Sequence, residues 1–109
     1  MAIRQESFRV AGTTFSNRQR YLRYLDVTGT KFRVILTREP KNKFDPNAIK
    51  VLVKTTEKKT LQLGYVPKEF AATLAPLMDA KVFIYINTCT IVGGFNCNYG
   101  AELNIGWYE

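Results

Sequence analysis

Residues 31–54 read KFRVILTREPKNKFDPNAIKVLVK, and this stretch decides the fold of the chain. Its beginning alternates apolar and polar residues with the period of two that is typical of a half-buried strand, so a strand is predicted over 31–38. The segment 38–47 holds two prolines and two asparagines, a composition that favours a loop. Residues 48–54 are rich in β-branched side chains and predict a second strand after this long connection.

The sequence on both sides of residues 31–54 also shows the periodic spacing of apolar residues that is typical of strands and helices. Alternating apolar residues predict four further strands, over 6–12, 61–66, 81–92 and 101–107. In the strand over 81–92, Val82, Ile84, Ile86 and Thr88 are expected to share one face. Helical spacing of apolar residues predicts a short basic helix over 17–25, capped by Ser16 or Asn17, and a second helix opened by Pro67. Six strands, two short helices and no parallel crossover pattern indicate a mainly β, small α+β fold. We expect a small twisted six-stranded barrel with helical insertions.

Composition excludes several classes of function. A chain of 109 residues with 46% hydrophobic residues can bury one core, so we expect a single folded domain. The absence of histidine excludes His-based acid–base catalysis, Ser-His and Cys-His nucleophile pairs, and most zinc sites. Cys89 and Cys97 are too far apart for a CxxC motif and are expected to be reduced thiols facing the interior. No metal and no other cofactor is expected.

The chain carries no pattern of export or membrane insertion. Its polar start, residues 1–6, lacks the apolar segment of a signal peptide. The longest apolar run, Val82–Ile86, has five residues, whereas a membrane helix needs about twenty. These features predict a soluble, cytoplasmic protein with no membrane partner.

Positive charge is concentrated in the first half of the chain. Residues 1–60 hold 14 basic and 5 acidic residues, whereas residues 61–109 hold 2 basic and 4 acidic ones, for a total net charge of +7. This asymmetry favours a surface directed at a polyanion such as nucleic acid. The alternative is that the basic half only keeps the protein soluble.

Several phrases of the sequence resemble the HIRAN domain family. They are Val10-Ala11-Gly12-Thr13 with Phe15, the run from Arg38 to Val51, Gly64 to Glu69, Leu74 to Leu77, and Tyr99-Gly100 followed by Leu103 and Ile105. The likeness extends from about Phe8 to Ile105, so the whole chain, 1–109, is interpreted as one domain with its core at about 8–105. The resemblance implies an OB-like or SH3-like barrel of six strands with two helices.

The resemblance also implies a function. Members of the family are regarded as DNA-binding modules and not as enzymes, and they occur in repair helicase-like translocases or as separate proteins. In the best understood members the domain captures the 3′-hydroxyl end of single-stranded DNA at a stalled fork. We therefore expect a monomeric module for single-stranded DNA, although the residues do not separate DNA from RNA. The alternative is an interaction module that docks on a separately encoded helicase or nuclease through exposed strand edges.

Asp45 has two interpretations. A carboxylate among lysines would repel a backbone phosphate but could accept a hydrogen bond from a terminal hydroxyl, and the family's hydroxyl-reading aspartate matches this position. Alternatively, the Asp45 side chain forms a turn by accepting from a backbone amide two residues later. The two roles are compatible.

The other candidate residues are aromatic or basic. Phe15, Phe44 and Tyr65 could stack on bases or pack in the core. Lys68, at the start of the second helix, could bind a phosphate or pair with Glu69. The further phosphate-binding candidates are Arg18, Arg20 and Arg23, which are expected to project outward from the first helix, together with Arg38, Lys41 and Lys43.

The sequence departs from the end-binding pattern in one segment. Where those members have an arginine and two tyrosines, this chain has Thr14, Phe15 and Ser16. One aromatic ring is kept, and the guanidinium and the second ring are lost. Asn17 and Arg18 follow directly and are candidates to replace the lost phosphate contact.

An enzymatic function is not favoured. Asp45, Glu39 and Glu57 are carboxylates in the basic half, so a metal-dependent nuclease stays open as an alternative. However, no D-x-[DE], E-x-K or H-N-H spacing accompanies them.

Overall fold

Eight elements build the fold of residues 2–109, which are the residues that the computed structural model describes. In chain order they are β1 Ile3–Arg9, α1 Arg18–Thr28, β2 Phe32–Arg38, β3 Ile49–Thr55, β4 Thr60–Tyr65, α2 Lys68–Asp79, β5 Tyr85–Val92 and β6 Gly100–Tyr108. The predicted mainly β, small α+β architecture with six strands and two helices is confirmed. The prediction of a single domain over 1–109 stays a prediction.

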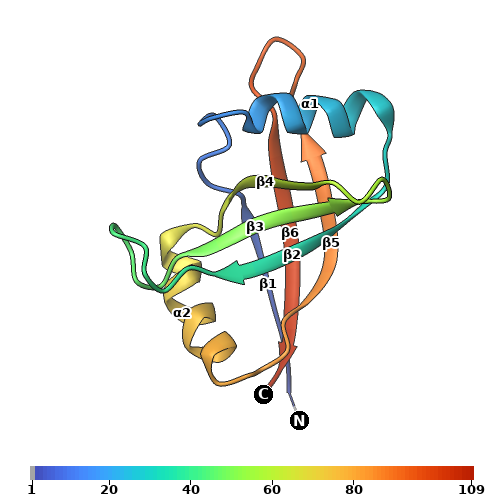
Figure 1. The fold of residues 1–109 in the computed structure, drawn as a ribbon. Coiled ribbons are helices and arrows are strands. Elements are labelled where there is room, and N and C mark those ends of the chain that lie inside the picture. Colours follow the sequence, from blue (N-terminus) through green and yellow to red (C-terminus); the bar gives the residue numbers. More distant parts are fainter. Residues whose placement is uncertain (1) are drawn as a thin grey trace.

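The strands form two antiparallel three-stranded sheets (Figure 1). Their orders are β1-β6-β5 and β2-β3-β4. Within residues 2–109, one isolated bridge between Ala11 and Tyr65 joins the segment after β1 to the end of β4. A closed barrel needs a continuous ladder of hydrogen bonds around all its strands. The six-stranded barrel therefore stays a prediction.

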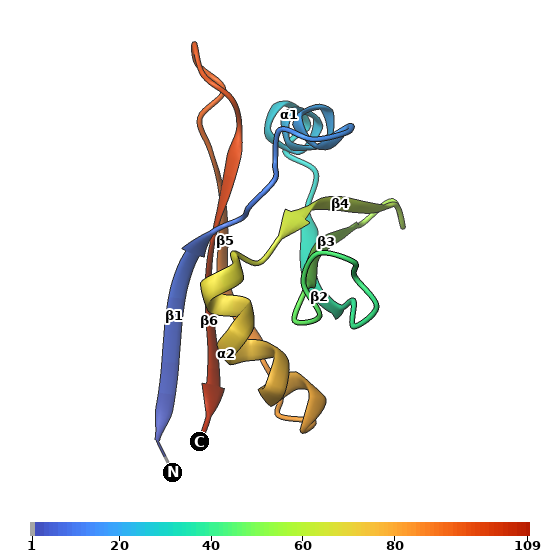
Figure 2. The same cartoon turned by 90° about the vertical axis from the view of Figure 1, so that its left-hand side faces the viewer.

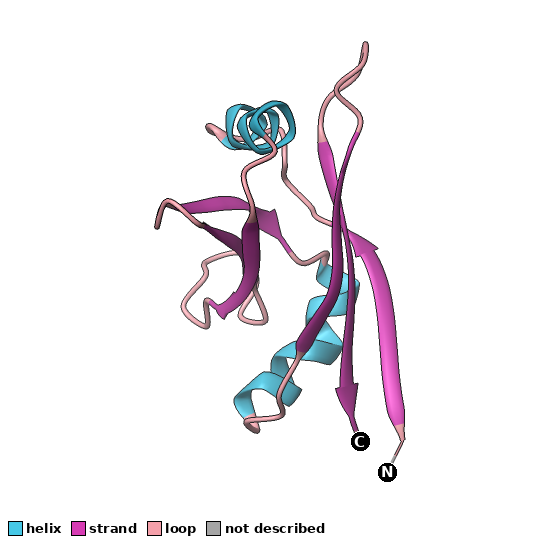
Figure 3. Cartoon of the chain, turned by 90° about the vertical axis from the view of Figure 1, so that its right-hand side faces the viewer, coloured by secondary structure: helices cyan, strands magenta, loops and turns pink. Residues whose placement is uncertain are grey.

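The core fills the space between the two sheets, and a helix lies across each end of it (Figures 2 and 3). The alternation that predicted the strands is the alternation of burial: Phe8 and Val10 are buried, whereas Arg9 between them is exposed. The largest fully buried side chains are Leu22, Ile49, Leu63, Leu74, Leu103, Ile105, Val51 and Val53. They come from α1, β3, β4, α2 and β6, so the core holds both sheets and both helices together.

Both helices start differently from the prediction. Asn17 stands at the N-cap of α1 but makes no capping hydrogen bond, and Ser16 before it has a positive φ of 55°. Pro67 is the N-cap residue of α2 rather than its first helical residue, with an extended ψ of 145°. Asn17 is therefore the N-cap residue, as predicted, but the expected side-chain hydrogen bond is absent, and Pro67 lies one position before its predicted place; the helices themselves are confirmed. Within residues 2–109, neither helix is long and apolar enough to cross a membrane.

The strand in the region 81–92 is shorter than predicted. In addition, the residues after Ile86 point to the opposite faces of the sheet from those predicted. The strand β5 starts at Tyr85, and a register shift between Ile86 and Thr88 turns Thr88 outward. The expectation that Thr88 shares the inward face of Ile86 was wrong, because a bulge adds one residue to the alternation.

The two cysteines have different environments. The side chain of Cys89 packs against the core, and burial raises the pKa of its thiol to about 11. Cys97 lies in the connection between β5 and β6 and is exposed, so the prediction that it faces the interior was wrong. The glycine- and asparagine-rich connection carries Cys97 beyond the sheet.

Candidate nucleic-acid interface

Tyr65, the last residue of β4, connects two loops of the basic half. Its backbone N–H donates to the carbonyl of Ala11 at 2.9 Å, and its carbonyl accepts from the N–H of Ala11 at 2.8 Å. The guanidinium of Arg18 lies over its ring, 5.5 Å from the centroid. Its hydroxyl donates to Oε1 of Glu39 at 3.0 Å. Tyr65 thus holds loop 12–17 and loop 39–47 together.

We call Tyr65 and these two loops, 12–17 and 39–47, the Tyr65 site. Figures 1 and 2 show both loops on the same side of the molecule, to the left of the sheets in Figure 1. The candidates Thr14, Phe15, Ser16 and Asn17 lie in the first loop, and Lys41, Lys43, Phe44 and Asp45 lie in the second. The fold therefore gathers the predicted loop residues on one face, although 24 or more positions separate the two sets in the chain.

Loop 12–17 is shaped by side chains of α1. Nη1 of Arg18 donates to the carbonyl of Gly12 at 2.7 Å, and Nε2 of Gln19 donates to the carbonyl of Thr13 at 2.9 Å. Gly12 has a φ of 73°, a left-handed conformation that glycine adopts at low cost. Phe15 is 67% exposed at the tip of this loop, so it is available for contact with a ligand.

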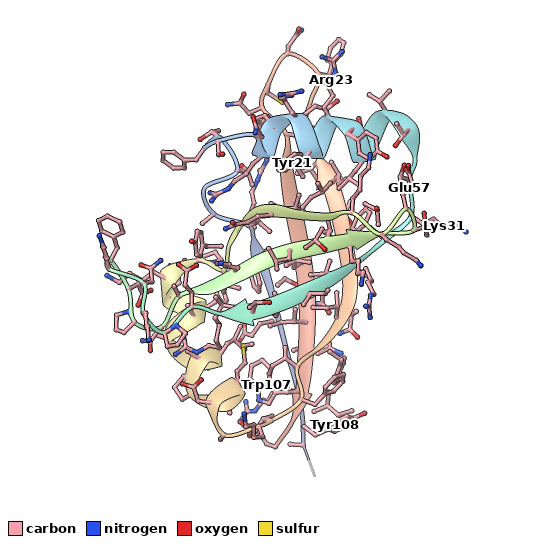
Figure 4. The ribbon with its side chains drawn as sticks, viewed as in Figure 1. Tyr21, Arg23, Lys31, Glu57, Trp107 and Tyr108 are labelled. Carbon is pink, nitrogen blue, oxygen red and sulfur yellow. The ribbon has the colours of Figure 1, made fainter. Side chains whose placement is uncertain are left out.

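Arg18 does not project outward as the sequence predicted. It is half-buried between the carbonyl of Gly12 and the ring of Tyr65, and its guanidinium stabilises the loop. Helical periodicity predicted an exposed position, but the first turn of α1 faces the returning loop. Arg20 and Arg23, also on α1, are exposed as predicted. In the view of Figure 4, Arg23 lies on the side of α1 opposite the β2-β3-β4 sheet.

Loop 39–47 is organised by the carboxylate of Glu39. This group accepts from the Asn42 amide, from the Tyr65 hydroxyl and, at 3.0 Å, from Nζ of Lys50. The hydrogen bond from Asn42 and that from Lys50 lower the pKa of the Glu39 carboxyl below its ordinary value of 4.5. Oδ1 of Asn42 in turn accepts from the N–H of Phe44 at 2.8 Å. A row of hydrogen bonds therefore runs from Tyr65 into the tip of the loop.

The turn predicted at Asp45 is confirmed. Its Oδ1 accepts from the backbone N–H of Asn47 at 2.9 Å, and its carbonyl accepts from the N–H of Ala48 at 3.0 Å. Among residues 2–109, no hydrogen-bond donor contacts Oδ2 of this half-buried carboxylate. The turn therefore uses one carboxylate oxygen and leaves the other to accept from a ligand.

The cations near the site differ in their availability. Lys41, Lys43 and Lys68 are exposed and make no salt bridge with any described residue. Arg38 instead donates to both oxygens of Asp79, at 3.0 and 3.2 Å, and to the carbonyl of Ala48 at 2.9 Å. Its guanidinium thus anchors β2 to the end of α2. The alternative pairing of Lys68 with Glu69 is not observed.

A cleft extends from the site along α1. It has a volume of about 400 Å³ and is lined by Asn17, Arg20, Tyr21, Tyr24, Lys59 and Leu61. In Figure 4, Tyr21 lies between α1 and β4. The cleft combines two tyrosine rings with two cations beside loop 12–17, which is the composition of a surface that binds a nucleotide chain.

The comparisons with known proteins show the family of the chain. The sequence model of the HIRAN domain matches residues 5–107, nearly the whole chain. The chain belongs to the HIRAN domain family. The crystal structure of the HIRAN domain of human HLTF aligns with a TM-score of 0.58 and 26% identity, covering 94% of this chain and 74% of that one.

Two curated relatives contain a similar segment. A Fanconi-associated nuclease 1 homolog from Oryza sativa subsp. japonica is 43% identical over 58 residues, which are 53% of this chain and 6% of that protein. The helicase-like transcription factor of Oryctolagus cuniculus is 44% identical over 59 residues, which are 54% of this chain and 6% of that protein. The HIRAN chain therefore matches a small part of each of these larger proteins.

Sequence reasoning missed the residues that hold the HIRAN loops in place. Gln19 donates to the carbonyls of Thr13 and Tyr99, and its Oε1 accepts from the N–H of Tyr99 at 2.8 Å. Glu39 was considered only as a carboxylate in a basic half. Its position in the sequence could have indicated a structural role. Glu39 directly precedes a proline and the loop that holds the candidates Lys41, Lys43 and Phe44.

The lowered pKa of Glu39 makes the loop sensitive to acid. A carboxylate with a folded-state pKa below its unfolded value stabilises the fold above the unfolded pKa, and the stabilisation is lost as the pH falls through the folded pKa. We expect Glu39→Gln to lower the free energy of unfolding at pH 7. The difference from the wild type should shrink below a pH of about 4.5. Urea unfolding of both proteins between pH 7 and pH 3, about the range that spans carboxyl titration, tests this. An equal difference across that range would show that the charge of Glu39 contributes nothing.

Proposed function

We propose that this HIRAN domain binds single-stranded DNA at the Tyr65 site, with the free 3′-hydroxyl end at Asp45. The observation that carries the proposal is the joining of two loops through Tyr65, because it brings exposed aromatic rings, unpaired lysines and a half-free carboxylate onto one face. The domain acts as a binding module without catalysis of its own, alongside a helicase or nuclease. Both names occur among the relatives, whose matching segments are 6% of their length.

Phosphate binding rests on the free lysines. Lys41 and Lys43 extend from loop 39–47, and Lys68 stands in the first turn of α2, where unpaired backbone N–H groups also favour an anion. Contacts of this kind give affinity without sequence preference and weaken as salt displaces the lysines from the phosphates. Arg38 and Arg18 have a lesser part in the proposal, because their guanidinium groups already donate to carbonyl or carboxylate oxygens.

Base contacts rest on the two exposed phenylalanines. Phe15 is 67% exposed and Phe44 is 92% exposed, one at the tip of each loop. Neither ring contributes to the core, so burial in the protein does not account for an aromatic residue at either position. Flat rings in a cationic groove stack on bases of any sequence. Thr14, Ser16 and Asn17, all exposed beside Phe15, supply polar groups for the sugar and phosphate.

In this proposal, Asp45 gives the preference for a free 3′-hydroxyl end of the DNA strand. Its Oδ2, which no donor in residues 2–109 contacts, can accept a hydrogen bond from a terminal 3′-hydroxyl. A continuing strand or a 3′-phosphate would instead bring a negative charge against the carboxylate. The loss of the arginine at the position of Thr14 leaves the penultimate phosphate to Lys41 and Lys43 in this proposal.

The end preference is tested with oligonucleotides of about ten nucleotides, near the size that one small barrel covers, at one fixed low salt concentration. We expect the 3′-hydroxyl form to bind about tenfold more tightly than the 3′-phosphate form, because the latter leaves an uncompensated charge pair. A 5′-phosphate should have little effect on affinity. Fluorescence anisotropy of labelled DNA gives the three dissociation constants.

Two variants of Asp45 distinguish its role in the turn from its proposed contact with the 3′ end of the DNA. Asp45→Asn keeps an oxygen that can accept from Asn47, so the loop is retained, but it removes the charge that repels a phosphate. The preference for the 3′-hydroxyl should therefore fall in Asp45→Asn and Asp45→Ala alike. Equal binding of hydroxyl and phosphate ends by the wild type would disprove end recognition. An absence of DNA binding at low salt would disprove the proposed function as a whole.

A further inference from the structure

The strand β2 has a free edge on the side of the sheet opposite β4. Its partner is β3, and the pairing is antiparallel with Phe32 opposite Thr55 and Arg38 opposite Ile49. At the two ends of this ladder, the N–H of Thr56 donates to the carbonyl of Lys31 and the N–H of Glu39 donates to the carbonyl of Ala48. Hydrogen-bonded and non-hydrogen-bonded pairs alternate along an antiparallel ladder.

This alternation identifies the backbone groups on the free edge. Because residues 31 and 39 bond to β3, the odd-numbered residues between them do so as well. The N–H and C=O groups of Phe32, Val34 and Leu36 therefore point away from β3. No backbone hydrogen bond joins β2 to β5 within the described part of the chain. The edge presents an alternating row of donors and acceptors to a further strand.

A groove runs along this edge. One part, of about 640 Å³, lies between the start of β2 and β5, and a second part, of about 330 Å³, lies between the middle of β2 and the segment 82–86. Val34 and Ile86 line both parts, so the two parts of the groove adjoin. Figure 3 shows the backbone on this side of the molecule, with one three-stranded sheet on each side of the view.

The two ends of the groove differ in chemistry. The second part is lined only by apolar side chains, including Leu36, Met78 and the 75% exposed Phe83. Cations surround the start of β2: Lys31 and Arg33 line the first part, and Lys54 lies directly opposite Arg33 on β3. None of these three cations makes a salt bridge with a described residue. Like charges placed opposite each other destabilise a sheet.

The acidic groups near this end are few. In Figure 4, Glu57 lies near Lys31 at the end of the β2-β3-β4 sheet, but its carboxylate accepts from the Tyr24 hydroxyl. No aspartate or glutamate lines either part of the groove. The unpaired cations therefore fit an acidic group that comes from outside the chain.

We propose that the free edge of β2 binds an extended peptide segment of a partner protein as an additional antiparallel strand. The segment is apolar in its N-terminal half, which lies along Leu36 and Phe83, and acidic in its C-terminal half, which reaches Lys31 and Arg33. Main-chain hydrogen bonds to Phe32, Val34 and Leu36 give affinity, and the two ends of the groove give direction. This surface is separate from the Tyr65 site.

The chemistry of the groove favours a peptide over the two other occupants. Nucleic acid has no repeating row of amide donors and acceptors to match a strand edge, and its charge is uniform, whereas one end of this groove is apolar. A second copy of the chain carries the same cations beside the same edge, and its net charge of +7 repels a like copy.

The test is amide hydrogen exchange measured by nuclear magnetic resonance with a synthetic probe, the acetylated peptide Val-Thr-Val-Thr-Val-Asp-Glu-Asp. In the free protein, the amides of residues 33, 35 and 37 should exchange slowly and those of 32, 34 and 36 rapidly. Saturating peptide should slow the second group by about tenfold or more and leave the first unchanged. The reversed sequence, and a peptide with lysine in place of the acids, should give much less protection.

Val34→Pro removes an outward N–H without breaking the ladder to β3, and edge strands tolerate proline at such positions. It should lower peptide affinity by about tenfold or more, while Val34→Thr, which keeps the N–H, retains it. Binding of single-stranded DNA by Val34→Pro should be unchanged, which also shows that the variant folds. If that variant fails to fold, the double variant Arg33→Glu and Lys54→Glu should exchange the preference from the acidic to the lysine peptide.

Three results would overturn the proposal. The first is rapid exchange at Phe32, Val34 and Leu36 in the presence of peptide. The second is protection of these amides by single-stranded DNA, which would assign the edge to the nucleic-acid surface. The third is protection that increases with protein concentration alone, which would assign the edge to a second copy. A failure of DNA binding would leave this test unaffected, because its readout is the strand edge.

Discussion

Replacing Gly64 with alanine should lower the free energy of unfolding by about 3 kcal/mol, a cost typical of a forced overlap in a packed interior. A Cβ at this position would lie 2.2 Å from the carbonyl oxygen of Ala11 and 2.7 Å from Cγ1 of Val10. That carbonyl cannot simply move away, because it accepts from the N–H of Tyr65 in the bridge between the sheets. Gly64→Ala should therefore separate the two loops and abolish DNA binding.

The matched control is Gly29→Ala. Gly29 has a φ of 64° at the C-terminus of α1, but a Cβ there would meet no heavy atom within 4 Å. Only the conformational cost of about 1 kcal/mol is expected, and DNA binding should be retained. Urea unfolding and DNA anisotropy measure both effects. A loss of stability at Gly64 no larger than that at Gly29 would contradict the assigned role of the bridge between Ala11 and Tyr65.

Structural features that depend only on residues close together in the sequence were mostly predicted correctly. The alternation around Phe8 and Val10 and along β2 follows from one buried face per strand, and the structure confirms it. The turn at Asp45 is also local, since its acceptor and donor are two residues apart. The same local reasoning failed in β5, where a bulge that no residue type announces turned Thr88 outward.

The contacts that build the Tyr65 site join distant parts of the chain and could not be read from local patterns. Gln19 reaches Tyr99 across 80 positions, and Tyr65 reaches Glu39 across 26. A basic helix predicted an outward Arg18, yet that side chain covers the Tyr65 ring. The candidate residues could therefore be proposed from the sequence, while the contacts of Arg18, Gln19 and Glu39 that hold the loops required the fold.

The residues of the Tyr65 site fall into two groups, those that hold the loops in place and those that are exposed to a ligand. Arg18, Glu39 and Asn42 have their polar groups bonded to the protein, so they hold the loops. The side chains of Phe15 and Phe44 are mostly exposed to solvent, so they are available to contact a ligand. Substitutions of the first group should change stability and binding together, whereas substitutions of the second group should change binding alone.

The double variant Phe15→Ala and Phe44→Ala should reduce affinity for single-stranded DNA by about a hundredfold, because stacking of a base on an aromatic ring is worth about 1–3 kcal/mol. Each single variant should lose about tenfold. The free energy of unfolding should change little, since the two rings are 67% and 92% exposed. Anisotropy titrations at fixed salt measure affinity, and urea unfolding measures stability.

Two other phenylalanines provide the control for this experiment. Phe83 is 75% exposed and Phe95 is 87% exposed, but both lie outside the loops of the Tyr65 site, at residues 12–17 and 39–47. The double variant Phe83→Ala and Phe95→Ala removes the same amount of exposed aromatic surface, so any general effect of that surface on DNA binding should appear in it. We expect this variant to bind DNA as the wild type does. If both double variants lost affinity equally, the contact with DNA would not be localised at the Tyr65 site, and its assignment as the binding surface would be wrong.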